Sequence, residues 1–249
     1  MPDLQWNVET WEEEHHWSNE GEEWSELWGG AEPQWFSAIY PRIHKFLPTD
    51  AVLEIATGYG RWTKYLIPQS ARYLGIDLST NGINHCKEIF SRLNHASFVK
   101  NDGLSLAAAR DGEFDFVFSF ESLVHVEADV MTSYIAQTLQ KLRQTGVAFF
   151  HHSNALEFAE QLPDPVPGSR ARSVSGESVR QIIKTHGGRL LVQELINWIG
   201  DVPDCFTLFA RSDYPSGAEP AILRNNEFYV ETSLIREFHS YYSRIGPKR

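Results

Sequence analysis

The sequence predicts an α/β fold of the doubly wound type, in which helices cover both faces of a mostly parallel sheet. Strand-like and helix-like segments alternate between residues 50 and 211, as they do in folds built from strand–helix–strand units. The last two expected strands, residues 190–198 and 206–211, lie too close together for a helical crossover. We therefore expect a Rossmann-like sheet of seven strands, mostly parallel, with a reversed last strand.

The first expected strand is followed by a tight turn and a helix start. Residues 52–55 form an apolar run interrupted by Glu54, and Gly58 and Gly60 follow it. Glycine lets a backbone pass close to a ligand where a Cβ would clash. A helix start offers free N–H groups. This stretch predicts a ligand site at the end of the first strand.

The second expected strand, residues 73–77, ends in an acid. Asp77 lies 17 residues beyond Gly60, where a carboxylate can accept hydrogen bonds from both hydroxyls of a ribose. Capping of the next helix is the alternative role for Asp77, although Ser79 can serve as that cap. The helices expected between the strands span residues 61–67, 81–93, 128–143 and 175–186.

Polar residues also lie at the ends of the fourth and fifth expected strands, which span residues 114–121 and 146–152. Ligands of doubly wound sheets bind at the carboxyl ends of the strands. Glu121 and the run from His151 to Asn154 are therefore expected close to the glycine turn. A proline-rich connection over residues 155–174 follows, and loops of this length are usually functional or mobile.

A nicotinamide-binding turn is the main alternative to be weighed. Its pattern, Gly-x-Gly-x-x-Gly, needs a third glycine for close packing of helix on strand. Thr63 occupies that position here, so the dinucleotide pattern is incomplete. A non-catalytic cofactor-binding subunit is a third hypothesis, and the polar strand ends argue against it.

The turn, with Glu54 four residues before Gly58, resembles motif I of the class I S-adenosylmethionine-dependent methyltransferases. This resemblance implies S-adenosylmethionine as the cofactor, with Asp77 on its ribose. It also implies a contact from Asp102 to the adenine amino group, for which an Asx-turn is the alternative. The cofactor-binding residues that it implies are Trp28, Trp35, Glu54, Ala56, Gly58, Gly60, Trp62, Asp77, Leu78, Asp102, Gly103 and Ser119.

Longer motifs resemble a narrower group. The stretches Trp28-Gly29, Phe118–His125 and Phe150–Asn154 are similar to those of bacterial sugar O-methyltransferases, the methylmannose polysaccharide 1-O-methyltransferases among them. The resemblance implies transfer of a methyl group to a hydroxyl of a saccharide or another small molecule.

Transfer to a hydroxyl requires a place for its proton, either a base or a metal that acidifies the hydroxyl. Histidine suits a general base because its pKa lies near neutrality, and the candidates are His151, His152 and His125. A Mg²⁺ site is the alternative, with Glu121, His152, Asp201 and Asp204 as its expected ligands. Magnesium prefers oxygen ligands, so a histidine ligand departs from the usual pattern.

The N-terminal part of the chain differs in composition from the rest. Residues 1–41 hold ten acids, no Lys or Arg, and six of the eight tryptophans. So much aromatic area argues against disorder. We expect a helical lid over residues 1–48, a methyltransferase core over 49–213, and a C-terminal helical extension over 214–249.

Composition also limits the expected partners. The net charge of −11 and the lack of a basic stripe argue against nucleic acid and an anionic membrane surface. Two cysteines cannot form a disulfide framework, and no apolar run is long enough for a membrane span. We expect a cytoplasmic enzyme whose apolar C-terminal segment docks on the domain or on a second subunit of a homodimer.

Overall fold

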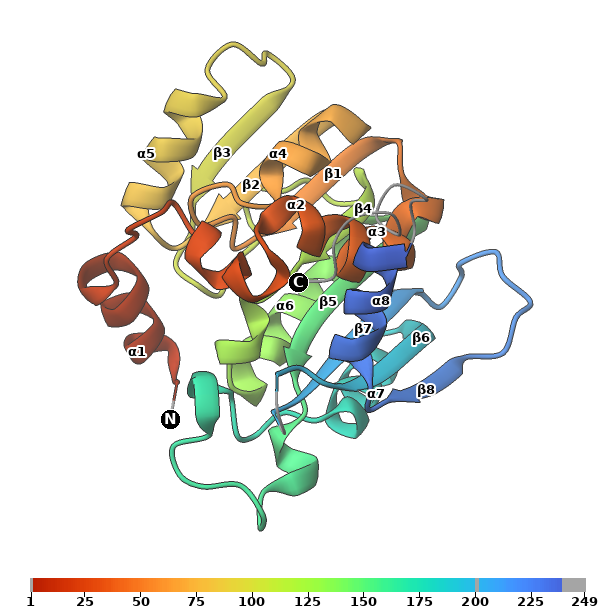
Figure 1. Ribbon diagram of the computed structural model, residues 1–249. Coiled ribbons are helices and arrows are strands. Elements are labelled where there is room, and N and C mark those ends of the chain that lie inside the picture. Colours follow the sequence, from red (N-terminus) through yellow and green to blue (C-terminus); the bar gives the residue numbers. More distant parts are fainter. Residues whose placement is uncertain (1, 200–201, 239–249) are drawn as a thin grey trace.

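One mixed sheet forms the centre of the protein (Figure 1), which the computed structural model describes over residues 2–199 and 202–238. The strand order is β3-β2-β1-β4-β5-β7-β6-β8. The strands are β1 (Thr49–Ile55), β2 (Ser70–Asp77), β3 (Ala96–Lys100), β4 (Phe114–Ser119), β5 (Leu142–Ser153), β6 (Gly188–Asn197), β7 (Pro203–Arg211) and β8 (Ala221–Asn225).

Helices connect and cover these strands. They are α1 (Leu4–Val8), α2 (Ala31–Gln34), α3 (Tyr40–Ile43), α4 (Thr63–Leu66), α5 (Thr80–Ile89), α6 (Ala128–Lys141), α7 (Gly176–Thr185) and α8 (Phe228–Phe238). Short π and 3-10 turns, such as Glu9–Glu14 and Glu22–Trp28, extend the N-terminal ones. The cap expected for α5 is confirmed, because the Ser79 hydroxyl accepts the N–H of Gly82.

The sheet confirms the mostly parallel arrangement but not the number of strands. Strands β1 to β5 pair in parallel, and β7 runs antiparallel to both β5 and β6. The prediction of seven strands is wrong, because β8 pairs in parallel with β6 at the edge. It forms from a short apolar run in the extension that was expected to be helical, and it covers an edge that would otherwise expose unpaired backbone groups. Residues 239–249 of the helical extension that was expected over 214–249 lie outside the described residues.

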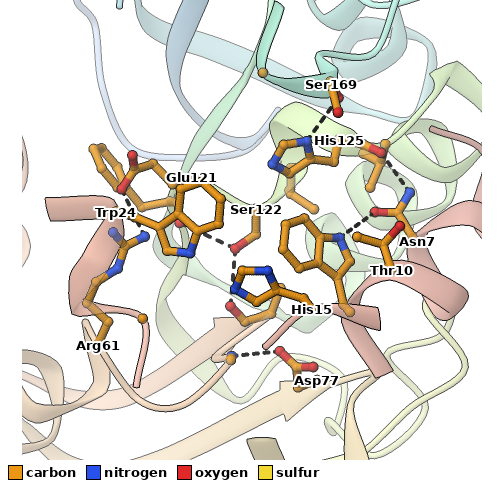
Figure 2. A pocket seen from close by; sticks show the side chains of 18 of the residues that line it. Asn7, Thr10, His15, Trp24, Arg61, Asp77, Glu121, Ser122, His125 and Ser169 are labelled. Carbon is orange, nitrogen blue, oxygen red and sulfur yellow. Dashed lines mark hydrogen bonds and ion pairs between the residues drawn. The ribbon is translucent and has the colours of Figure 1, made fainter. Parts of the chain in front are cut away.

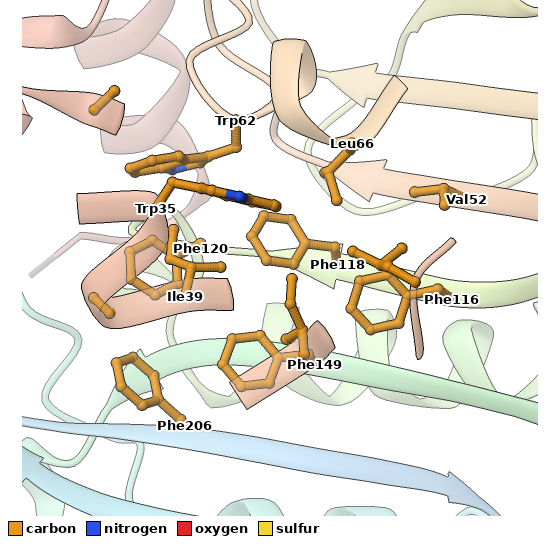
Figure 3. Packing of buried hydrophobic residues seen from close by; sticks show 14 of the residues in the cluster. Trp35, Ile39, Val52, Trp62, Leu66, Phe116, Phe118, Phe120, Phe149 and Phe206 are labelled. Carbon is orange, nitrogen blue, oxygen red and sulfur yellow. The ribbon is translucent and has the colours of Figure 1, made fainter. Parts of the chain in front are cut away.

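Side chains alternate between two hydrophobic layers, as the pleat of a strand requires. Along β4, Phe116 and Phe118 face the helices α2, α3, α5 and α8, while Val117 faces α6 and α7. Figure 3 shows the first layer, in which Trp35 packs against Phe118 and Trp62 against Phe120. Cys86 is fully buried in this layer.

Arg42, which lies in α3, joins three parts of the chain. Its guanidinium donates to both oxygens of Glu194 in β6, at 2.6 and 2.7 Å, and to Glu231 in α8 at 3.0 Å. It also lies 5.3 Å from the ring centre of Phe206 and 5.1 Å from that of Phe228. The N-terminal helices and α8 are therefore fastened to the sheet by one mostly buried cation.

We predict that Arg42→Met lowers the free energy of unfolding by about 3 kcal/mol, because it leaves Glu194 without its charged partner in a mostly buried position. Arg72→Met is the matched control. Arg72 is 47% exposed in its ion pair with Asp50, so its loss should cost less than about 1 kcal/mol. Urea denaturation of both variants measures the difference, and equal losses would contradict the role given to Arg42.

Candidate active site

A cavity of about 680 Å³ lies at the carboxyl ends of β1, β2 and β4 (Figure 2). Its other walls are the N-terminal segment, defined here as residues 2–28, the 167–170 loop, and the connection between β6 and β7. The strand-end residues that line it are Ala56, Thr57, Gly58, Asp77, Leu78, Gly103, Glu121 and Ser122. Of the strand-end residues that the sequence predicted would meet, Gly58, Asp77 and Glu121 line the cavity, whereas Asp102 and the run from His151 to Asn154 do not.

The glycine turn and Asp77 form a small hydrogen-bonded unit at the floor of the cavity. The N–H of Gly58 donates to Oδ2 of Asp77 at 2.7 Å, and the N–H of Ser79 donates to Oδ1 at 2.7 Å. Burial raises the pKa of Asp77, although these N–H bonds favour the carboxylate. Gly58 has a φ of +52°, which glycine adopts without the cost that a Cβ brings.

Gly60 has a different role from the one expected. It does not line the cavity, and a Cβ at this position would lie 3.1 Å from Phe90 and 3.3 Å from the sulfur of Cys86. Its φ is +88°. The structure therefore places this glycine at the close approach of α5 and outside the lining of the cavity, and its contact with the cofactor stays a prediction.

Glu54 and Ser119 lie beneath the cavity and do not line it. Glu54 is fully buried and accepts hydrogen bonds from the hydroxyls of Tyr73 and Thr63. Burial raises its pKa to about 7. Ser119 donates to the carbonyl of Ile55 at 2.9 Å. Both side chains join neighbouring elements, and their predicted contacts with the cofactor stay predictions.

Asp102 also differs from the prediction. Its Oδ1 accepts the N–H groups of Leu104 and Ser105 at 2.9 and 2.7 Å, which is the Asx-turn alternative, and these bonds lower its pKa. The side chain is exposed and lies outside the lining of the cavity. Gly103 does line the cavity beside Leu78, as expected.

The structure gives the tryptophans of residues 1–41 different places from those predicted. Trp28 and Trp35 are 0% and 3% exposed and pack in the core, so they are not cavity residues. The spacing of Trp35, Ile39 and Ile43, which places them on one face of a helix, is the signal in the sequence that could have indicated this burial. The tryptophans that line the cavity are Trp6, Trp11, Trp17 and Trp24, together with the expected Trp62.

Polar contacts fasten the N-terminal segment over the cavity. The amide of Asn7 donates to the carbonyl of His125 at 2.7 Å. Glu12 accepts the N–H of Thr80 at 2.6 Å, at the start of α5, and the ammonium of Lys100 at 3.0 Å. Burial opposes the charge on Glu12, yet these bonds lower its pKa to about 2. Trp17 stacks on Tyr59, with ring centres 4.7 Å apart.

Of the three histidines predicted as candidate bases, His125 is the one that lines the cavity. Its Nδ1 lies 2.9 Å from the carbonyl oxygen of Ser169. A carbonyl only accepts, so Nδ1 carries the proton. Burial and the charge of Arg170 lower the pKa of His125 to about 4, so the ring is neutral near pH 7 and Nε2 keeps its lone pair.

His151 lies just behind the lining, between Phe120 and Trp198 (ring centres at 4.8 and 4.5 Å). Its Nδ1 accepts the N–H of Glu121 at 3.2 Å, and its Nε2 lies 3.1 Å from Asp204. Burial lowers its pKa, although Asp204 opposes this change. Both nitrogens are therefore engaged, and the structure gives His151 no free lone pair for a substrate proton.

His152 points to the opposite face of β5, as expected for consecutive strand residues. Its Nδ1 donates to the carbonyl of Ser153, and its Nε2 accepts from the hydroxyl of Thr207, both at 2.8 Å. It is fully buried and does not line the cavity. The predicted roles of His152 as base and as metal ligand are wrong, because its ring packs on the far side of the sheet.

The residues proposed for Mg²⁺ do not form a suitable ligand set. The carboxylate of Asp204 accepts bonds from Arg170 and His151, and Glu121 pairs with Arg61 at 2.9 Å. Asp201 lies outside the described residues. Over residues 2–199 and 202–238, no group of three His, Cys, Asp or Glu side chains is arranged to hold a metal ion.

Comparison with known proteins identifies the type of domain. Residues 52–146, from β1 to β5, match a family model described as a methyltransferase domain. This part of the chain is therefore similar to a methyltransferase domain. No curated protein matches the chain.

Solved structures share the fold of this methyltransferase domain. The PH0226 protein of Pyrococcus horikoshii is 20% identical, with a TM-score of 0.57, over 82% of this chain and 95% of that one. The N-methyltransferase NodS of Bradyrhizobium japonicum, with S-adenosylhomocysteine, is 18% identical (TM-score 0.56, 86% and 97% covered). Magnesium protoporphyrin IX methyltransferase of Synechocystis, with the same ligand, is 16% identical (TM-score 0.56, 73% and 85% covered).

The cavity fits the cofactor of such a domain. Asp77 and the backbone of Ala56 and Gly58 lie at the strand ends where a nucleoside binds in this type of sheet. The hydroxyl oxygen of Thr57 is buried there without a hydrogen-bond partner among the described residues. No helix in the described part of the chain has the length and apolarity to cross a membrane.

Because histidines are buried in their neutral form, we predict that the protein loses stability in acid. The pKa of His152 is lowered to about 4 by burial, below its ordinary value of about 6.5. Between these pH values the unfolded state binds more protons, so the free energy of unfolding falls as the pH falls. The loss from this one residue reaches about 3 kcal/mol.

His152→Gln should therefore show a smaller change in unfolding free energy between pH 6.5 and pH 4 than the wild type does. Urea denaturation at a series of pH values measures this slope. An unchanged slope would contradict the assignment of His152 as a buried neutral histidine.

Proposed function

We propose that this methyltransferase transfers a methyl group to a hydroxyl of a sugar-like small molecule, with His125 as the proton acceptor. The observation that carries this proposal is the state of His125. It is neutral, it faces the cavity, and its Nδ1–H is held by Ser169.

The cofactor contacts follow from the floor of the cavity. Asp77 would hold the ribose, the backbone at Ala56 and Gly58 the methionine part, and Leu78 and Gly103 the adenine side. S-adenosylmethionine supplies an electrophilic methyl group on its sulfonium. The protein then has to orient the acceptor oxygen and take its proton.

Nε2 of His125 suits that second task. Because Ser169 fixes the Nδ1–H tautomer, the lone pair of Nε2 is available to the acceptor hydroxyl. Asn7 and Trp11 pack beside the ring, with the Trp11 centre 5.2 Å from the imidazole. A general base held in one tautomer needs no rearrangement at the moment of transfer.

The walls above the floor support a sugar-like acceptor. Indole faces, here those of Trp6, Trp11 and Trp24, bury the apolar face of a sugar ring. Hydroxyls of the same ring can form hydrogen bonds with the carboxylates and amides of the cavity. We further propose that the N-terminal segment acts as a lid that closes over the bound ligands.

A transfer assay tests the proposed function. The protein is incubated with methyl-labelled S-adenosylmethionine and a panel of mono- and oligosaccharides, small alcohols and amines, with and without EDTA. Transfer to a saccharide hydroxyl that EDTA does not abolish is expected, since the ligand set does not suit Mg²⁺. Transfer to amines alone would refute the hydroxyl acceptor, and failure to bind S-adenosylhomocysteine would refute the cofactor.

We predict that His125→Asn lowers kcat about a hundredfold or more, the usual contribution of a general base. The asparagine amide can keep the bond to Ser169 but offers no basic nitrogen in place of Nε2. Calorimetry should show unchanged affinity for S-adenosylhomocysteine. His152→Gln is the matched control and should keep its activity, whereas a fully active His125→Asn variant would exclude His125 as the base.

A further inference from the structure

Buried polar groups without hydrogen-bond partners gather around the cavity. Nine residues of the described chain carry such side-chain atoms, and five of them line this cavity: His15, Trp17, Glu23, Thr57 and Trp62. Buried polar groups in native proteins are almost always paired. A concentration of unpaired ones in one cavity indicates groups that a ligand satisfies.

Glu23 differs from the other acids of the described residues. Both of its carboxylate oxygens are buried without a hydrogen-bond partner, and its side chain is 19% exposed. Within the described part of the chain, its ion-pair contact is with Nε2 of His15, 3.5 Å away. A carboxylate in such a position is costly unless donors reach it.

The surroundings of Glu23 exclude one class of ligand. The Arg residues that line the cavity are already paired, Arg61 with Glu121 at 2.9 Å and Arg170 with Asp204 at 2.8 Å. No cation of the described lining is therefore free to receive a phosphate. A phosphorylated acceptor would instead meet the unpaired carboxylate of Glu23.

Aromatic rings surround the same place. The centre of the His15 ring lies 5.4 Å from Trp11, 4.7 Å from Trp17 and 5.4 Å from Trp24. Figure 2 shows Trp24 and His15 on the side of the cavity opposite Ser169. A ligand here requires an apolar face for the indoles and hydrogen-bond donors for the carboxylate.

We propose that Glu23 binds two adjacent hydroxyls of an uncharged glycoside, and that sugar phosphates and nucleotide sugars are excluded. This inference rests on the proposed function and names the acceptor class. Two hydroxyls on neighbouring carbons donate to the two oxygens of one carboxylate, which is the pairing that Glu23 lacks. Trp11 and Trp24 cover the apolar face of the sugar ring.

The test uses Glu23→Gln, with Glu13→Gln as the matched control. Glu13 is an exposed acid of the same N-terminal segment, outside the cavity lining. Binding of methyl glucoside, methyl mannoside and methyl galactoside to the S-adenosylhomocysteine complex is followed by tryptophan fluorescence. The 6-phosphates of these sugars, and deoxy analogues that lack one of two adjacent hydroxyls, are titrated in parallel.

The wild type and Glu13→Gln should bind at least one neutral glycoside, and Glu23→Gln should bind it about tenfold to a hundredfold more weakly. The deoxy analogue should lose affinity in the wild type but little further affinity in Glu23→Gln. Equal glycoside affinity in the two variants, or preference for a 6-phosphate, would overturn the inference.

Affinity for S-adenosylhomocysteine, measured by calorimetry, separates the two proposals. If only this affinity falls in Glu23→Gln, the carboxylate serves the cofactor's ammonium group and the inference is wrong. If the wild type binds glycosides through Glu23 but transfers no methyl group to them, the proposed function fails while the binding role of Glu23 stands.

Discussion

The buried carboxylate of Asp204 holds together the parts of the chain that shape the side of the cavity lined by His125. It lies in β7, between β5 and β6, and accepts bonds from Arg170 at 2.8 Å and from His151 at 3.1 Å. Burial opposes its charge, but these two partners lower its pKa to about 2. Because His151 donates to Asp204 through Nε2, its Nδ1 is free to accept the N–H of Glu121. That bond supports Glu121 at a φ of +58°, a conformation that costs a non-glycine residue free energy. Arg170 in turn fixes the loop whose Ser169 carbonyl selects the tautomer of His125.

The sequence allowed the sheet and the position of the cavity to be predicted well, because both follow from periodicity and from the glycine turn. Roles of individual residues were harder to predict where a side chain can serve two purposes. Asp102 accepts local N–H groups instead of facing the cavity, and Glu54 pairs with Tyr73 beneath it. Local spacing does not distinguish these outcomes. The choice between His151 and His152 as a base failed for a similar reason, since their partners, Asp204 and Thr207, come from a strand more than fifty residues away.

The N-terminal segment depends on the rest of the chain for its charge balance. Residues 1–41 carry ten acids and no Lys or Arg, so every ion pair with Lys or Arg that these acids make has to reach beyond residue 41. Glu12 pairs with Lys100, and Glu22 with Lys64. Such exposed pairs contribute little stability, whereas the indoles that pack over the cavity contribute more through buried area. The ion pairs then mainly fix where the aromatic surface docks. Among the described residues, no Lys or Arg forms an ion pair with Glu23, and this is the reason for the proposal that its carboxylate binds a ligand of the cavity.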